Sequence, residues 1–168
     1  YYTPEPVVNY IVRSLNIILK ENFNRRDGFA THSVTVLDPA AGTLTFLAEA
    51  TRLALQEFVD KYGSGTKEQF IQDHILKHFF AFELMMAPYA IAHMKVGLKL
   101  AETGYRFHSA ERARIYLTNA LEPWLKQLRL IGFDALAHEA ADVNEVKRHK
   151  RFTIIIGNPP YSLTSANM

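Results

Sequence analysis

The sequence contains no cysteine. This absence excludes disulfides, zinc knuckles and thiolate nucleophiles, and it is compatible with a reducing compartment. No apolar run reaches the roughly 20 residues that a membrane-spanning helix needs. The sequence also has no strong excess of positive or negative charge. It contains 19 Lys and Arg and 17 Asp and Glu, which gives a net charge of +2. Such a balance neither indicates nor excludes nucleic-acid binding, so partners must be inferred from motifs.

The rest of the composition is that of an ordinary globular domain, with 48% hydrophobic and 21% charged residues. It excludes disordered and fibrous proteins, and 168 residues suffice for one hydrophobic core. The sequence begins with Tyr1 rather than Met, no signal peptide follows, and a conspicuous motif lies close to the last residues. We therefore expect a piece of a longer polypeptide, with some functions located outside it.

Apolar residues at helical spacing predict an amphipathic helix from Pro4 to about Asn24, with Thr3 as its N-cap. Further helices are predicted at 46–62, about 67–77, 88–102 and 122–150, the last one interrupted at Gly132. Runs of β-branched and aromatic residues predict four strands, at 33–37, 79–82, 114–117 and 152–156. Strands that alternate with helices are typical of a three-layer α/β fold around a mainly parallel sheet.

Polar residues follow each of the four predicted strands. They are Asp38, Glu83, the Thr118-Asn119 pair and Asn158. Ligands of open parallel sheets bind beyond the carboxyl ends of the strands, which all lie at one rim. We therefore expect these four separated segments to meet at that rim.

The last predicted strand runs into Asn158-Pro159-Pro160-Tyr161, a motif that fits the methylation of an amino nitrogen. An amine conjugated to a ring is a poor nucleophile because its lone pair is delocalised. The Asn158 side-chain oxygen and the Pro159 carbonyl can accept its hydrogens and favour a more tetrahedral nitrogen. The prolines stiffen the backbone, and Tyr161 offers a face for stacking a flipped-out base. The structural alternative is a Pro-Pro turn that ends a strand.

Small residues from Asp38 to Gly42 follow the first predicted strand, where a helix is about to begin. Such residues let the backbone approach a ligand, and the helix N-terminus offers free N–H groups to a carboxylate. The loop is neither a Walker phosphate loop nor a three-glycine dinucleotide fingerprint. Glu83 can hydrogen-bond both hydroxyls of a ribose, or it is a solvated acid at a turn.

The order of these motifs resembles that of the adenine-N6 DNA methyltransferases of the gamma arrangement, found in type I and single-polypeptide restriction-modification enzymes. The resemblance rests on Tyr2-Thr3-Pro4, Asp38-Pro39-Ala40-Ala41-Gly42, Phe82-Glu83, Thr118-Asn119-Ala120-Leu121 and Asn158-Pro159-Pro160-Tyr161. It implies a Rossmann-like class I S-adenosylmethionine-dependent methyltransferase fold. The expected organisation is a helical segment, 1–30, packed on a truncated catalytic core, 31–168, without a target-recognition domain.

The same resemblance implies roles for individual residues. The catalytic set is Asn158, Pro159, Pro160 and Tyr161, and the cofactor-binding set is Tyr2, Thr3, Pro4, Asp38, Ala40, Gly42, Glu83, Leu84 and Asn119. In that assignment the residues around Thr3 close over the methionine end of S-adenosylmethionine, Glu83 holds the ribose, and Leu84 packs on the adenine ring.

Two positions depart from the family pattern. Asn119 stands where the family commonly has an acid facing the adenine of the cofactor. Leu44 stands where the family usually has a second glycine, a residue that allows close backbone approach. We expect the Leu44 side chain to point into the space of the cofactor rather than into the packing of the following helix.

The resemblance implies double-stranded DNA as the substrate, bound by the full-length protein, together with other domains or subunits of a restriction-modification enzyme. It further implies a cytoplasmic setting without a membrane, and we expect the isolated fragment not to methylate DNA. Two alternatives stay open. The same four-residue motif occurs in protein-glutamine and RNA-base methyltransferases, although Tyr2-Thr3-Pro4 favours the DNA group. The other alternative is a non-catalytic structural fragment that needs the rest of its polypeptide.

Other conspicuous residues are more simply interpreted as structural. His74 and His78, four apart on a predicted helix, lack a third ligand for a metal, so we expect no metal site. The basic run from Lys147 to Arg151 is more typical of a solvated helix end than of a DNA contact. Met85 and Met86, like the phenylalanines of the second strand, are expected in the core.

Overall fold

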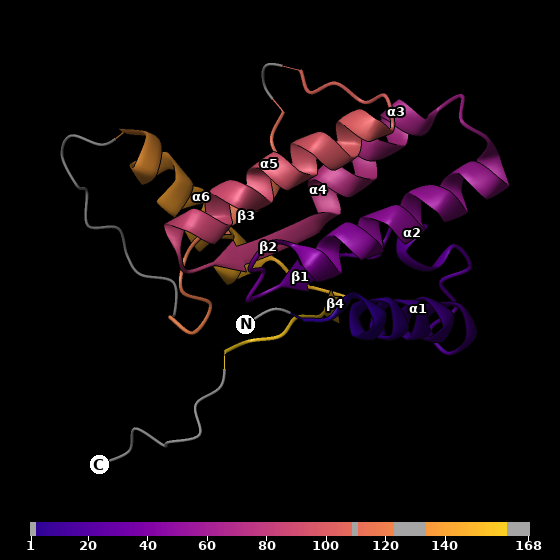
Figure 1. The fold of residues 1–168 in the computed structure, drawn as a ribbon, viewed down its shortest axis with the longest axis horizontal. Helices are drawn as coiled ribbons and strands as arrows, with labels where there is room; N and C mark the ends of the chain where they lie inside the picture. Colours follow the sequence, from indigo (N-terminus) through magenta and orange to yellow (C-terminus); the bar gives the residue numbers. More distant parts are fainter. Residues whose placement is uncertain (1–2, 109–110, 123–133, 161–168) are drawn as a thin grey trace, which may run out of the picture.

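The structure, a computed structural model, describes residues 3–108, 111–122 and 134–160. Its strands are β1 (Val36–Asp38), β2 (Phe79–Glu83), β3 (Arg114–Leu117) and β4 (Ile154–Ile155). They form one sheet in the order β3-β2-β1-β4, and every neighbouring pair is parallel. The predicted α/β fold with a parallel sheet is thereby confirmed (Figure 1).

The long helices are α1 (Glu5–Glu21), α2 (Thr45–Tyr62), α5 (Met86–Glu102) and α6 (Asp134–His149). A short 3₁₀ turn, η1 (Gly28–Ala30), precedes β1. The helix predicted at about 67–77 is a continuous run of α3 (Lys67–Phe70), the π-helical segment η2 (Ile71–Ile75) and α4 (Leu76–His78). The first strand begins later than predicted, because the Val34 N–H donates to the Thr31 carbonyl in a turn.

Two layers of helices cover the two faces of the sheet. Successive strand side chains point to opposite faces. One face carries Val36, Phe79, Ala81, Ile115 and Ile154 and packs with α1, α2 and α5 into the larger core. The other face carries Leu37, Phe80, Phe82 and Tyr116 and packs against Val143 and Val146 of α6. Figure 1 shows α5, α2 and α1 lying alongside one another, with α6 set apart from them.

The start of α1 differs from the sequence prediction. The N-cap residue is Pro4 and not Thr3, and no side chain caps the helix. Pro4 ends the preceding segment in an extended conformation, with φ −57° and ψ 138°, and Pro6 fits the first turn because N–H groups there have no helical partner. The Thr3 hydroxyl is therefore available for another contact. Val8 and Val12 anchor this helix in the larger core.

The loop between β2 and α5 also corrects the sequence analysis. Met85 and Met86 are 61% and 58% exposed, whereas the phenylalanines of β2 are buried as predicted. The two methionines lie beyond the strand end, at the start of α5, where no described element covers them. None of the helices in the described ranges has the length and apolarity needed to cross a membrane.

Candidate active site

The polar residues predicted at the strand ends lie at one rim of the sheet. Asp38 is the last residue of β1, Glu83 is the last residue of β2, and Asn158 comes three residues after β4. Because all three strands run parallel in one sheet, their carboxyl ends share a rim. This part of the sequence prediction is confirmed.

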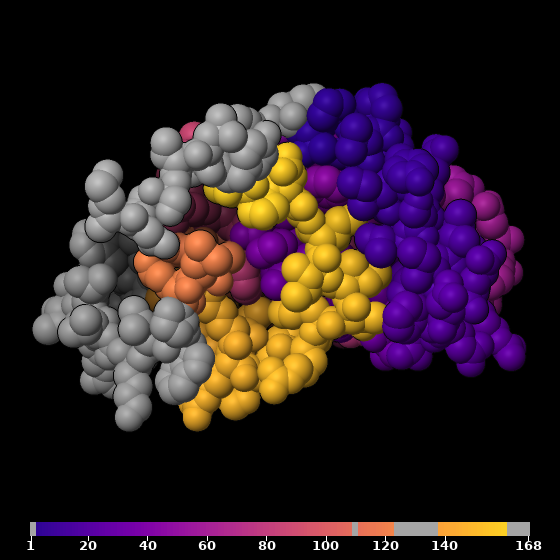
Figure 2. Space-filling model, turned by 90° about the horizontal axis from the view of Figure 1, so that it is seen from below, coloured from indigo at the N-terminus to yellow at the C-terminus, as the bar shows by residue number. Residues whose placement is uncertain are grey.

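A cavity of about 290 Å³ opens at this rim. Its described lining comes from four separated segments: Thr3, Ala40, Ala41, Gly42, Thr43, Thr45, Phe46, Met85, Pro88 and Asn158. Four of these residues, Thr3, Ala40, Gly42 and Asn158, belong to the set inferred from sequence. Figure 2 shows the same closeness of distant segments, with the yellow residues near the C-terminus lying against the indigo residues of the N-terminus.

Backbone hydrogen bonds hold the loop between β1 and α2. The Ala40 N–H donates to Asp38 Oδ1 at 3.1 Å, and the Ala41 N–H donates to the Phe82 carbonyl at 3.0 Å. Gly42 has φ +52°, and no atom lies within 4 Å of the position that a Cβ would take there. The glycine therefore lets a ligand in the cavity approach the backbone closely.

Asp38 is a buried carboxyl group that accepts a hydrogen bond from this loop. Its Oδ2 has no hydrogen-bond partner among the described residues, and the side chain is 1% exposed. Burial raises the pKa of Asp38 to about 7; the Ala40 N–H opposes this rise and the charge of Glu83 adds to it. A Cβ on Gly157 would lie 2.5 Å from Asp38 Oδ1. Only glycine therefore lets the segment after β4 pass this close to Asp38.

Glu83 links the same loop to β2. Its Oε2 accepts the Gly42 N–H at 2.7 Å and its Oε1 accepts the Met85 N–H at 2.9 Å. The residue is 6% exposed, so it is not the solvated acid considered from sequence. Each carboxylate oxygen has a second lone pair, which leaves capacity for the hydroxyls of a ligand.

Leu44 does not point into the rim cavity, contrary to the expectation from sequence. The residue adopts the left-handed conformation, with φ 66° and ψ 33°, which glycine adopts most easily. Its side chain is 1% exposed and belongs to the larger core. Leu44 is the N-cap residue of α2, and its side chain is buried between α2 and α5. This burial offsets the strain of its backbone conformation.

Asn158 contacts the opposite end of the chain. Its Nδ2 donates to Thr3 Oγ1 at 3.0 Å. The Asn158 Oδ1 remains available on the other side of the amide, as the predicted acceptor role requires. Pro159 and Pro160 follow as exposed residues outside regular secondary structure. Tyr161 and Tyr2, which the sequence analysis also assigned to the site, lie outside the described residues.

The remaining predicted residues lie near the rim but outside the described lining of the cavity. Pro4 is the N-cap residue of α1, and Leu84 is 64% exposed. Asn119 folds back on its own loop, where its Oδ1 accepts the Leu121 N–H and its Nδ2 donates to Glu122. The cofactor roles of these three residues stay predictions.

Lys147, at the end of α6, anchors the loop after β3. Its Nζ donates to Thr118 Oγ1 at 2.9 Å and to the Asn119 carbonyl at 2.7 Å. Burial lowers the pKa of Lys147. This lysine is therefore part of the internal structure rather than a solvated helix end.

The histidine pair is structural. His74 is 2% exposed, its Nε2 donates to the Phe29 carbonyl at 2.7 Å, and its Nδ1 accepts from His78 Nδ1 at 3.0 Å. Both ring nitrogens of His74 are thereby occupied. In the described part of the chain, no group of three His, Asp or Glu residues could hold a metal ion.

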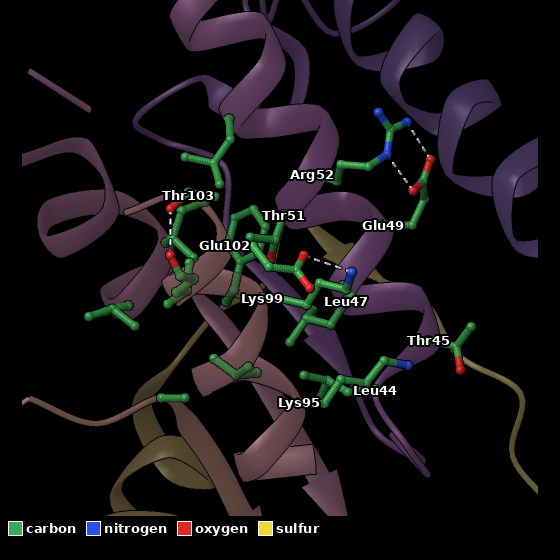
Figure 3. A pocket seen from close by; sticks show the side chains of 18 of the residues that line it. Leu44, Thr45, Leu47, Glu49, Thr51, Arg52, Lys95, Lys99, Glu102 and Thr103 are labelled. Carbon is green, nitrogen blue, oxygen red and sulfur yellow. Dashed lines mark hydrogen bonds and ion pairs between the residues drawn. The ribbon is translucent and has the colours of Figure 1, made fainter. Parts of the chain in front are cut away.

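A larger cavity, of about 670 Å³, lies between α2 and α5 (Figure 3). Several of its charged side chains already have partners in the protein. Arg52 pairs with Glu49, Lys99 pairs with Glu102, and Lys95 Nζ donates to the Thr43 carbonyl at 3.0 Å. The smaller rim cavity is the better candidate, because the carboxyl ends of the parallel strands and Asn158 meet there.

Sequence reasoning assigned no individual site role to the cavity residues contributed by helix starts. Thr45 and Phe46 begin α2, and Met85 and Pro88 flank the start of α5. The signal was present, because each of these helices follows a strand end that the analysis had already placed at the rim. The anchoring lysines, Lys95 and Lys147, carry no comparable signal, since their partners are distant backbone carbonyls.

The comparison with protein families identifies the class of this chain. Residues 1–168 match the family described as N-6 DNA methylase, so the chain belongs to that family. A comparison with curated protein sequences gave no significant match.

Solved structures carry the same fold. The type ISP restriction-modification enzyme LlaGI, a nuclease-deletion mutant in complex with a DNA substrate mimic, is 28% identical over 96% of the chain, with a TM-score of 0.76. The ATP-dependent type ISP enzyme LlaBIII, bound to DNA, is 28% identical over 99%, with a TM-score of 0.77. The M protein of the type I restriction enzyme EcoKI, at 23% identity over 99% of the chain and a TM-score of 0.56, supports the fold alone. The chain spans 13%, 11% and 26% of these three proteins, respectively.

Proposed function

We propose that this chain is the cofactor-binding and catalytic part of an adenine-N6 DNA methyltransferase of a restriction-modification system, with S-adenosylmethionine as methyl donor. The observation that carries the proposal is the rim cavity, which Asn158 borders together with the Gly42 loop and Thr3. Membership of the N-6 DNA methylase family favours DNA over a glutamine side chain or an RNA base as substrate. The proposed setting is a cytoplasmic enzyme with further domains or subunits.

The residues at the cavity fit a nucleoside with an amino-acid tail. Glu83 lies next to the loop and has lone pairs for the two ribose hydroxyls, while the open side of Gly42 admits close backbone contact. The unpartnered Asp38 Oδ2 is a buried acceptor suited to an ammonium group. Residues near Thr3 would close over the same end of the cofactor.

Asn158 acts on the target base in this mechanism. When bound, S-adenosylmethionine supplies an electrophilic methyl group, and its sulfur keeps the electron pair of the broken carbon–sulfur bond. The Asn158 side-chain oxygen and the Pro159 carbonyl accept the two hydrogens of the adenine amine, so that its lone pair becomes available for the new bond. The nitrogen then loses one proton to water, and no strong base is needed.

The proposal is tested with the full-length protein that carries this chain. Incubation with tritiated S-adenosylmethionine and DNA should place the label on adenine N6, as read by nucleoside analysis. Label in RNA or in protein glutamine would instead support the alternative substrates. Absence of both cofactor binding and transfer in a folded protein would support a purely structural role.

A further inference from the structure

We infer that Thr3 is a positioning residue for catalysis: its hydroxyl orients the Asn158 amide so that the amide oxygen faces the target amine. The inference rests on the proposed function and deepens it. Sequence reasoning placed Thr3 only on the cofactor side of the site. The structure joins it directly to the motif on the base side, through the 3.0 Å hydrogen bond from Asn158 Nδ2 to Thr3 Oγ1.

The orientation of this amide determines whether Asn158 can work. One end of the group is an acceptor and the other is a double donor, and only the oxygen can accept a hydrogen from the amine. The terminal torsion of asparagine is broad and roughly two-fold, so an unanchored amide samples both orientations. Asn158 is exposed, and among the described residues its side chain has one hydrogen-bond partner, Thr3.

The backbone on both sides of this contact is fixed. Gly157 packs against Asp38 and Pro39, and the preceding Ile156 N–H donates to the Leu37 carbonyl at 2.9 Å. On the other side, α1 is anchored in the core through Val8 and Val12. The torsions of the Asn158 side chain are therefore the main freedom that remains, and the Thr3 hydroxyl restrains them.

Thr3 also has capacity to serve both halves of the site. It makes no capping bond to α1, so its hydroxyl is not occupied by the helix. A hydroxyl that accepts one hydrogen bond retains a second lone pair and its own proton. Because Thr3 and Asn158 both border the rim cavity, a ligand that orders Thr3 there also orders the Asn158 amide.

The test compares Thr3→Val with Thr3→Ser in the full-length protein. Valine has the shape of threonine without the hydroxyl, whereas serine keeps it. At saturating cofactor and DNA, Thr3→Val should lower the single-turnover rate of methyl transfer by about three- to tenfold, the usual scale for one hydrogen bond. Thr3→Ser should recover most of the rate. The dissociation constant of S-adenosylmethionine should change less than the rate does.

A second comparison isolates the orientation itself. In an Asn158→Asp background the side chain ends in two oxygens, so its orientation no longer matters and Thr3→Val should have no further effect on the residual rate. Thr66→Val is the matched control, because Thr66 is exposed and makes no capping bond to α3. Circular dichroism confirms that each variant is folded.

The outcomes separate the two claims. A wild-type protein that transfers no methyl group to DNA overturns the proposed function, and this inference with it. If the wild-type protein is active and Thr3→Val transfers methyl groups as fast as the wild type, only the role of Thr3 is overturned. The same follows if Thr3→Val weakens cofactor binding as much as it slows transfer and serine does not restore the rate.

Discussion

Residues 38–44 and residues 157–160 border the same cavity, but they are held in different ways. The first segment is bonded along its length, by Phe82, Glu83 and Lys95, and it ends in the buried Leu44. In the second segment, Asn158, Pro159 and Pro160 are exposed. Its described contacts are the close passage of Gly157 by Asp38 and the bond from Asn158 to Thr3.

This difference indicates that the two halves of the site are preorganised to different degrees. A binding loop with many internal bonds is formed before its ligand arrives, which lowers the entropic cost of binding. An exposed catalytic motif with one side-chain anchor gains its final geometry from neighbours and from substrate. Substitutions in the two segments should therefore affect different measurements.

Asn158→Ala in the full-length protein should show the largest difference between the effect on methyl transfer and the effect on cofactor binding. The variant loses an acceptor that is used mainly as the amine becomes tetrahedral, so methyl transfer should fall by on the order of 10²–10³-fold. The dissociation constant of S-adenosylmethionine, measured by calorimetry, should stay nearly unchanged. A loss of cofactor binding as large as that in a Glu83 variant would show that the roles are not divided in this way.

Much of this division could be predicted from sequence, because it depends on local signals. A β-branched strand followed by Asp38 or Asn158 places these residues at the strand end whatever the details of packing. The Thr3 contact could not be predicted, since it joins residues 155 positions apart through a side-chain hydrogen bond. Thr3 also resembles an N-cap in sequence, and only the extended Pro4 shows that the helix begins after it.

Leu44 was misplaced for a related reason. Its position in the motif indicates a glycine-like backbone, which the φ of 66° confirms, but the sequence does not determine the direction of the side chain. That direction depends on the space between α2 and α5, which distant residues create.

Leu44→Gly should therefore destabilise the loop after β1 rather than improve the site. Truncating a buried leucine costs about 2–5 kcal/mol, and relief of the left-handed conformation returns about 1 kcal/mol. The free energy of unfolding, from urea titration of the 168-residue chain, should fall by about 1–4 kcal/mol. Leu121→Gly, at a position that is 93% exposed, is the control and should change it by less than about 0.5 kcal/mol. Tighter cofactor binding with unchanged stability in Leu44→Gly would contradict this placement.

The variant Glu83→Gln tests whether the charge of the Glu83 carboxylate is needed to hold the same loop. Glutamine keeps the size of the side chain but presents an NH₂ group to either the Gly42 or the Met85 N–H, so one of the two backbone bonds is lost. Loss of the charged acceptor should cost about 1.5–3 kcal/mol of cofactor binding, equivalent to about 10- to 100-fold in the dissociation constant. The transfer rate at saturating cofactor should change less. Glu21→Gln, at an exposed position in α1, is the control.

The last prediction concerns Asp38, which belongs to the first segment and lies beside Gly157 of the second, and its effect is a change in the dependence of stability on pH. Burial raises the pKa of Asp38 to about 7 from 3.8, so its contribution to stability is complete below about pH 3.8 and is lost as the pH rises through 7. Burial, with the charges of His74, Lys150 and nearby groups, lowers the pKa of His78 to about 4 from 6.5. Its contribution has the opposite sign, being complete above pH 6.5 and lost as the pH falls through 4.

These two contributions oppose each other between about pH 4 and 6.5, and single variants should separate them. In Asp38→Asn the free energy of unfolding should decrease steadily as the pH falls from 6.5 to 4, because the histidine contribution is then unopposed. Relative to the wild type, His78→Gln should lose part of the rise in stability between pH 4 and 6.5, because His74 and His93, whose pKa values burial also lowers, keep their own contributions. Urea titrations of both variants and the wild-type chain at half-unit intervals measure the slopes and their signs. If Asp38→Asn had the same profile as the wild type, the Asp38 carboxyl would not have the raised pKa that its burial implies.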